Sequence, residues 1–276
     1  MKDKMGSIPV YDSSMRGIPA LEELRELIQY RNLVLQTIRR NIVVRYKRSV
    51  LGIAWTMLSP LGTTLVLTIV FSKIFGGSSV YAVYVLSGLI CWTFFVQTTT
   101  DSINNLVWGG GLLRRIYVPR TVFAVAAIGT GLVNIVLSLV PLIFVMLISG
   151  VYPNTSMLIL PIPAILLAMF ALGIGLLLST IAIYFADVTD MYGIILTAWM
   201  YLSPIIYKEE MVPSKYIWII HMNPMYYLID LFRTPILEGK VPDITEFLMA
   251  GGIGLISLLI GWLVFSHKAD EFAYHI

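Results

Sequence analysis

Charge is scarce in this sequence. Only 13% of the 276 residues are Asp, Glu, Lys or Arg, whereas 58% are hydrophobic and the mean hydropathy is +0.83. A soluble domain of this length has too little interior to hide so much apolar surface from water. The net charge of +3 also gives no overall basic field suited to nucleic acid. The sequence therefore predicts an integral membrane protein that binds no nucleic acid.

The sequence also lacks the motifs of catalysis and of metal binding. Its one cysteine, Cys91, excludes an internal disulfide and a cysteine metal cluster. It has no G-x-x-x-x-G-K-[ST] phosphate loop and no H-E-x-x-H zinc motif. His221 has no second ligand nearby in the sequence, which favours a packing role. We expect no catalytic, cofactor-binding or metal-binding residues and no ATP hydrolysis by this chain.

Long apolar runs, in contrast, are abundant. A helix needs about 20 apolar residues to cross the ~30 Å hydrocarbon core of a bilayer. Six segments qualify, although the fifth is short and ends at Ser203-Pro204. They are residues 51–75, 81–101, 117–149, 157–185, 191–207 and 245–266. Because no pattern of short alternating strands is present, we predict an all-α fold with six transmembrane helices.

Lys and Arg are distributed unevenly about these spans. An even number of spans puts both termini on one side, and that side collects 14 of the 19 cations. Cytoplasmic loops carry the excess of Lys and Arg, so both termini are predicted to be cytoplasmic. We divide the chain into a cytoplasmic N-terminal segment at 1–50, a membrane domain at 51–266 and a cytoplasmic tail at 267–276.

Residues 19–48 combine frequent charges with regularly spaced apolar residues. Pro19 and three glutamates in the first turns suit the N-terminal end of a helix. The apolar residues recur close to helical spacing. We predict an amphipathic interfacial helix on the inner membrane surface; a soluble helix packed on a partner fits the same pattern. The cations Arg45, Lys47 and Arg48 at its end also fix the direction of the first span.

The loop at residues 101–120 is more apolar than a free connector needs to be. Asp101 or Ser102 would cap a short helix there, and the glycines at 109–111 would end it. A short apolar and basic helix at the cytoplasmic end of two spans suits docking into a groove on a soluble partner; an ordinary connector is the alternative. The docking candidates are Leu106, Trp108, Leu112, Leu113, Arg114 and Arg115.

On the outer side, residues 207–243 contain two apolar pieces, 216–222 and 225–237, which are each too short to cross a bilayer. Asn223-Pro224 separates them. We predict short re-entrant or interfacial helices between spans five and six, because such helices are tolerated where they pack against protein.

Polar and aromatic residues within the spans give the remaining signals. The spans carry almost no ionisable residues, which argues against an ion-coupled carrier. Asn134 is the most conspicuous polar side chain of the third span, and we expect it to form an interhelical hydrogen bond. Most membrane aromatics pack or lie at the interface, but sugar rings also stack on aromatic faces. The candidates for lining a glycan conduit are Trp55, Trp199, Tyr201 and Tyr207.

Five segments, taken in order, resemble a known family. They are RYKRSVLGIAWTMLSPL at 45–61, LLRRIYVPR at 112–120, YFADVTD at 184–190, LSPIIY at 202–207 and NPMYYLIDLFR at 223–233. Together, on six spans, they are similar to the permease subunits of type-2 ABC transporters that export O-antigens, capsules and teichoic acids. Trp108 and the three glycines after it depart from the family's pattern in the coupling loop.

The resemblance implies a homodimer with a conduit between the copies, built largely from spans one and five. It implies two separate soluble ATP-binding-cassette subunits, which hold ATP and Mg²⁺ and contact the N-terminal helix and the 101–115 loop. The docking candidates above thereby become ATPase-coupling candidates. The implied substrate is a glycan on undecaprenyl pyrophosphate in a bacterial cytoplasmic membrane. Arg45, Lys47 and Arg48 would lie where the lipid phosphates approach.

Three other functions are compatible with the same residues. One is an ABC exporter of a small lipid or drug, which would not need the conduit aromatics. The second is a membrane-embedded glycan polymerase or ligase, for which Arg233 and Glu209 would be pocket residues. The third is a scaffold that transports nothing and needs no ATPase.

Overall fold

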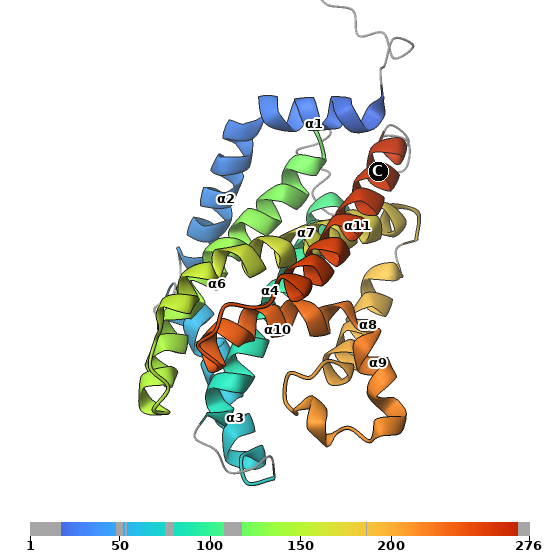
Figure 1. Ribbon diagram of the computed structural model, residues 1–276. Helices are drawn as coiled ribbons and strands as arrows, with labels where there is room; N and C mark the ends of the chain where they lie inside the picture. The colour runs from blue at the N-terminus through green and yellow to red at the C-terminus, as the bar shows by residue number, and fades with distance from the viewer. Residues whose placement is uncertain are drawn as a thin grey trace, which may run out of the picture.

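The computed structural model describes residues 18–47, 52, 54–74, 80–107, 118–185 and 187–269. Within these ranges the chain forms α-helices and short 3-10 helices and contains no strand. The predicted all-α fold is therefore confirmed. Figure 1 shows the long helices gathered into a bundle, with α1 (Pro19–Gln29) lying across one end and α9 (Ile217–His221) at the other.

Five helices of the described chain are long and apolar enough to cross a membrane. They are α3 (Ala54–Phe71), α4 (Tyr81–Val107), α6 (Thr121–Ile148), α7 (Pro161–Tyr184) with the preceding 3-10 turn η2 (Thr155–Ile159), and α11 (Ile244–Lys268). Each falls within or close to a predicted span. These five account for every predicted span except the fifth.

The fifth predicted span, residues 191–207, is shorter in the structure. Its helix, α8 (Val188–Leu202), has 15 residues and rises about 22 Å. Ser203 is already extended, with φ −97° and ψ 137°, because the ring of Pro204 disfavours helical backbone in the residue before it. A helix of this length does not cross the hydrocarbon core by itself.

The N-terminal segment is two helices, so the prediction of a single helix over 19–48 is wrong. The chain turns at Tyr30 (φ −90°, ψ 17°) between α1 and α2 (Arg31–Tyr46). Helix α2 packs along α6, with Val34 buried against Val122 and Ala126. The apolar face expected on one interfacial helix is therefore divided between a crosswise α1 and an α2 packed on the bundle (Figure 1).

The helix predicted to begin at Asp101 or Ser102 is the end of α4. Both residues lie within α4, which continues to Val107. The Ser102 hydroxyl donates to the carbonyl of Thr98 at 2.7 Å, as a residue inside a helix does. Neither side chain therefore caps a new helix.

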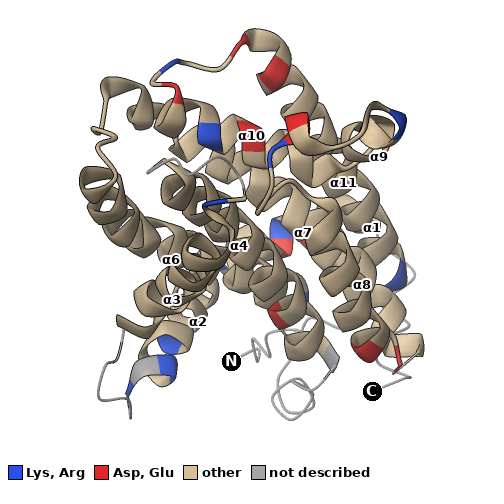
Figure 2. Ribbon diagram, turned by 90° about the horizontal axis from the view of Figure 1, so that it is seen from below, with Lys and Arg blue, Asp and Glu red and all other residues tan. Residues whose placement is uncertain are grey.

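Residues 207–243 contain the short helices that the sequence predicts. Helix α9 ends at His221 and α10 (Pro224–Leu237) follows, preceded by the 3-10 turns η3 (Glu209–Met211) and η4 (Ser214–Tyr216). Asn223 caps α10, because its side-chain oxygen accepts a hydrogen bond from the Met225 amide at 3.0 Å. Figure 2 shows charged residues along these segments and on α2, whereas the long helices are largely uncharged.

Helix α4 is largely buried in the centre of the bundle, and α3 is largely exposed. Among the described helices, α7 and α11 pack against each other most extensively. A Cβ atom on Gly261 of α11 would collide with the backbone of Gly173 of α7. Small residues at such crossings let helices in membranes approach closely, which fixes the two long helices against each other.

Candidate functional site

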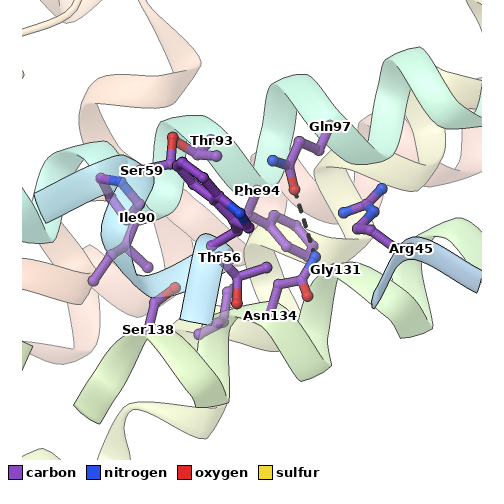
Figure 3. A pocket seen from close by; sticks show the side chains of 13 residues that line it. Arg45, Thr56, Ser59, Ile90, Thr93, Phe94, Gln97, Gly131, Asn134 and Ser138 are labelled. Carbon is purple, nitrogen blue, oxygen red and sulfur yellow. Dashed lines mark hydrogen bonds between the residues drawn. The ribbon is translucent and has the colours of Figure 1, made fainter. Parts of the chain in front are cut away.

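A cavity of about 400 Å³ lies between α3, α4 and α6, and Arg45 of α2 is at one end of it. Figure 3 shows Arg45 beside Gln97, whereas Ser138 and Ile90 lie toward the opposite end. The other lining residues are Trp55, Thr56, Ser59, Pro60, Thr93, Phe94, Gly131, Asn134 and Ile135. We refer to this space as the α3/α4/α6 cavity.

Helical spacing explains why these residues face one another. The α4 wall is formed by Ile90, Thr93, Phe94 and Gln97, at i, i+3, i+4 and i+7. The α6 wall has the same spacing, from Gly131 through Asn134 and Ile135 to Ser138. Residues so spaced form one stripe on a helix. The cavity is thus the space between two facing stripes, with α3 closing part of one side.

Two observations position the walls. The Asn134 amide donates to the Gln97 side-chain oxygen at 3.5 Å, which confirms the interhelical hydrogen bond expected of Asn134. Gly131 faces α4 closely, since an added Cβ would collide with side-chain atoms of Thr98 and Phe94. The absence of a side chain at 131 therefore lets α6 approach α4 beside the cavity.

Arg45 is held at the cavity by an acid on another helix. Its Nη2 atom lies 3.3 Å from Oδ2 of Asp101 on α4, and both side chains are more than a third exposed. Water screens such a pair, so its net contribution to stability is about 0–1 kcal/mol. The pair positions the guanidinium and leaves it donors for another group, because arginine carries five N–H bonds.

The structure brings together two residues that the sequence suggested for different roles. Arg45 was a head-group candidate and Trp55 a conduit candidate, and both line the same cavity. Trp55 is 56% exposed, so much of its side chain is not covered by the rest of the described chain. Lys47 is exposed at the end of α2, and Arg48 lies outside the described residues.

The other conduit candidates, Trp199, Tyr201 and Tyr207, lie at or just after the C-terminal end of α8. Trp199 packs inside the bundle, with its ring centre 5.2 Å from that of Phe95 and 6.2 Å from that of Trp92. Tyr201 is exposed, and its carbonyl accepts a hydrogen bond from the Tyr207 hydroxyl at 3.1 Å. A conduit-lining role stays a prediction for all of them, and Tyr201 has the most open ring.

Asn223 connects α8 to α10. Its side-chain oxygen accepts a bond from the Trp199 indole nitrogen at 2.8 Å. Its amide nitrogen donates to the Ser203 hydroxyl at 2.8 Å and to the Leu202 carbonyl at 3.3 Å. The LSPIIY and NPMYYLIDLFR segments are thereby joined, which gives the break after α8 a fixed geometry.

Arg233 completes this connection from inside the protein. It is 4% exposed, and its guanidinium donates to the carbonyls of Pro204 at 2.6 Å, Ile205 at 3.1 Å and Tyr84 at 3.1 Å. The non-helical backbone after α8 therefore has hydrogen-bond partners within the protein. Structural contacts occupy this arginine, which weakens the polymerase interpretation.

Glu209 is engaged in the same way. The Tyr226 hydroxyl donates to its Oε2 at 2.6 Å, and His221 Nε2 lies 2.7 Å from its Oε1. The hydrogen bond from Tyr226, and secondly that with His221, hold the pKa of Glu209 below its usual value against the opposing effect of burial. Glu209 thus links the loop that follows α8 to α10. In the described chain, no group of three or more potential metal ligands occurs, at Glu209 or elsewhere.

The predicted coupling region is only partly described. Leu106 is 2% exposed and packs with Ala124, Leu176 and Phe265, so its side chain supports the end of α4. Its coupling role stays a prediction. The remaining coupling candidates lie outside the described residues. They are Trp108, Leu112, Leu113, Arg114 and Arg115.

Helix α1 lies at the same end of the bundle. The Thr121 hydroxyl at the start of α6 donates to the Glu23 carboxylate at 2.9 Å, and the Trp262 indole of α11 donates to the Ala20 carbonyl at 3.0 Å. These bonds attach α1 across the ends of two long helices. Leu21 on its opposite face stays exposed.

Sequence reasoning missed most of the polar residues in the cavity. Thr93 and Gln97 stand four residues apart in one predicted span, and Asn134 and Ser138 stand four apart in the next. Paired polar residues at this spacing indicate a polar stripe on each helix. That spacing, repeated in two predicted spans, could have indicated a polar site. It does not show that the two polar stripes face each other.

Comparison with known proteins gives one family and consistent relatives. A sequence model described as "ABC-2 type transporter" matches residues 32–237. The chain is 25% identical to the O-antigen export system permease protein RfbA of Myxococcus xanthus, over 92% of this chain and 98% of that protein. It is 24% identical to RfbA of Klebsiella pneumoniae, over 88% and 94%. It is 23% identical to the polysialic acid transport protein KpsM of Escherichia coli, over 84% and 91%.

Proposed function

The chain belongs to the ABC-2 type transporter family, and from this premise we propose that it is the permease subunit of an ATP-driven polysaccharide exporter. The cargo in this proposal is a glycan of the O-antigen, capsule or teichoic-acid kind, carried on undecaprenyl pyrophosphate. The observation that supports it most is the extent of the similarity. Relatives named for O-antigen export or for polysialic acid transport align over 84% or more of this chain.

ATP hydrolysis belongs to separate subunits in this proposal. The sequence has no phosphate loop, and the RfbA relatives are named permease proteins. Two soluble ATP-binding-cassette subunits would hold ATP and Mg²⁺ and contact α1 and the loop after α4. The exposed apolar residues Leu21, Leu24 and Ile28 give α1 a face suited to a partner or to the membrane surface.

A second copy of the chain would cover α3 and α8. Both helices leave large apolar residues uncovered, including Leu65 and Ile69 on α3 and Ile194 and Ile195 on α8. Lipid covers such residues as well as protein does, so exposure alone does not identify the partner. Within the family, a conduit between two copies would lie beside these helices, where Trp55 and Tyr201 are exposed.

The protein would reside in the bacterial cytoplasmic membrane with both termini in the cytoplasm. Support comes from the contact between α1 and the C-terminal part of α11, through Trp262 and Ala20. The two ends of the described chain therefore lie at one end of the bundle. In this orientation Arg45 would approach the lipid phosphate from the inner side, and Lys47 follows it on the exposed end of α2.

Copurification from the native cell in a gentle detergent tests the proposal. We expect the tagged chain to bring down a stoichiometric soluble protein that contains a phosphate loop. The purified complex, placed in vesicles, should move undecaprenyl-linked polysaccharide only when ATP is present. Recovery of the chain alone, or with glycan-assembly enzymes and no ATPase after crosslinking, would contradict it. A small lipid or drug as the only transported molecule would favour the alternative exporter.

A further inference from the structure

We propose that the α3/α4/α6 cavity binds one hexose unit that is joined to a phosphate group. Its hydroxyl and amide side chains would contact the sugar, and Arg45 would contact the phosphate. This inference rests on the proposed function, because it specifies which part of a lipid-linked glycan the site recognises. It also makes the cavity residues, in addition to the conduit aromatics, determinants of specificity.

The cavity has more polar groups than its own hydrogen bonds use. Its walls contribute six uncharged polar side chains. They are Thr56, which has a partner of its own, and Ser59, Thr93, Gln97, Asn134 and Ser138. The hydrogen bond drawn between them in Figure 3, from Asn134 to Gln97, is long at 3.5 Å. Polar side chains within membrane helices usually bond across helices or mark a pathway for a polar ligand.

Ser138 is the strongest single indication. It is 7% exposed and faces the cavity, and its hydroxyl makes no hydrogen bond within the described chain. Thr98 on the neighbouring helix α4 and Thr130 on the same helix α6 behave differently, because each donates to the carbonyl four residues earlier. The Ser138 hydroxyl does not bond its own helix and is accessible from the cavity, so it is available to a ligand or to water there.

The charges of the residues that line the α3/α4/α6 cavity indicate the kind of ligand that fits it. Among the described residues that line the cavity, Arg45 carries the only charge. A neutral, hydroxyl-rich group therefore fits the interior, and an anionic group fits the Arg45 end. Asp101 already contacts Arg45 at 3.3 Å. A phosphate would consequently use the remaining donors of the guanidinium or displace this exposed acid.

The dimensions fit one small group better than a chain. Each wall extends over eight residues, from Ile90 to Gln97 and from Gly131 to Ser138, so its ends are about 10 Å apart along the helix. Trp55 and Phe94 supply apolar ring surface beside the polar groups. Ligand sites combine apolar walls with a few placed polar groups in this way.

The test compares two lipids on the permease assembled with its ATPase partners in phosphatidylcholine nanodiscs. One radiolabelled probe is undecaprenyl pyrophosphate bearing one glucose, and the other is undecaprenyl pyrophosphate without sugar. We expect the wild type to bind the sugar-bearing probe more tightly. Ser138→Ala should weaken that binding by about three- to tenfold, the loss of one neutral hydrogen bond, and leave the sugar-free probe unchanged.

Two further variants separate recognition from folding. Thr93→Val removes a second cavity hydroxyl with little change of shape and should also act on the sugar-bearing probe alone. Ser149→Ala, after the outer end of the same helix α6, lies outside the cavity and should affect neither probe. Equal affinity of the wild type for both probes, an equal loss for both in Ser138→Ala, or no loss for either would each overturn the inference.

Two remaining outcomes distinguish the sources of failure. Phosphatidylglycerol also carries hydroxyls beside a phosphate. If it displaces the sugar-bearing probe, and if Ser138→Ala weakens the binding of both lipids equally, the cavity binds bulk lipid and the proposal is overturned. No binding of either probe by a complex that retains its ATPases would overturn the carrier lipid of the proposed function, and the inference with it. Binding of both probes without an effect of Ser138 overturns the inference alone.

Discussion

The guanidinium carbon of Arg233 lies 3.7 Å from the centre of the Tyr84 ring. The Tyr84 hydroxyl in turn donates to the carbonyls of Pro204 at 2.9 Å and Tyr207 at 2.8 Å. The cation, the ring and the turn after α8 therefore form one connected unit. It joins α4 and α10 to the segment that follows α8.

Removal of Arg233 should destabilise the protein strongly. Arg233→Leu removes the donor from the Pro204 and Ile205 carbonyls, whose bonds are buried, and from the partly buried Tyr84 carbonyl. Each bond to a charged group contributes about 1.5–3 kcal/mol. We expect the free energy of unfolding in detergent to fall by about 3 kcal/mol or more. Arg31→Leu, at an exposed position on α2, is the control and should change it little. Equal stability of the two variants would contradict the role assigned to Arg233.

The crossing of α7 and α11 should not tolerate one added methyl group. Gly261→Ala places a Cβ against the backbone of Gly173, and overpacking of this kind costs about 1–3 kcal/mol. Gly252→Ala on the same helix has no atom near its Cβ and should be neutral or slightly stabilising. Thermal unfolding in detergent measures both variants. A neutral Gly261→Ala would mean that the helices separate easily at this point.

The attachment of the outer loop to α10 should weaken in acid. In the folded protein the pKa of Glu209 lies below its usual value of 4.5. The ionised carboxylate therefore stabilises the fold fully at a pH above 4.5, and this contribution is lost as the pH falls through the lowered pKa. Hydrogen exchange in residues 208–222, corrected for intrinsic rates, should therefore increase below pH 4.5. In Glu209→Gln this increase should be absent. A pH response that persists in this variant would assign it to another group.

Arg45 should matter more for transport than for stability. Arg45→Gln breaks an exposed ion pair with Asp101, so we expect the free energy of unfolding to change by about 1 kcal/mol or less. A lost charge-assisted bond to a lipid phosphate should lower export by about tenfold. The matched variant is Arg39→Gln, an exposed cation of the same helix outside the cavity. Identical export by the two variants would show that Arg45 acts only through charge near the first span.

The sequence predicted those features that one segment determines alone. Apolar length located the membrane helices, and Asn223-Pro224 located the boundary between α9 and α10, where Asn223 is the cap. The resemblance also predicted the family, because its motifs keep their order along the chain. These features depend on composition, on proline and on local hydrogen bonds.

The features that it did not predict depend on distant parts of the chain. The turn at Tyr30 has no proline or glycine to mark it. The pairing of Arg45 with Asp101 joins residues 56 positions apart, and that of Arg233 with Tyr84 joins residues 149 apart. The cavity likewise requires the facing stripes of α4 and α6 to be in register. Such relationships arise from packing, which no single segment encodes.

The break after α8 changes how the protein meets a bilayer of given thickness. A helix of 15 residues is about 8 Å shorter than the hydrocarbon core. The Leu202, Pro204 and Ile205 carbonyls beside this break accept hydrogen bonds from Asn223 and Arg233, so non-helical backbone within a bilayer would need no water there. The turn would thus accommodate the difference between the length of α8 and the thickness of the hydrocarbon core. We expect the acyl-chain length of the surrounding lipids to alter activity only when these hydrogen bonds are lost.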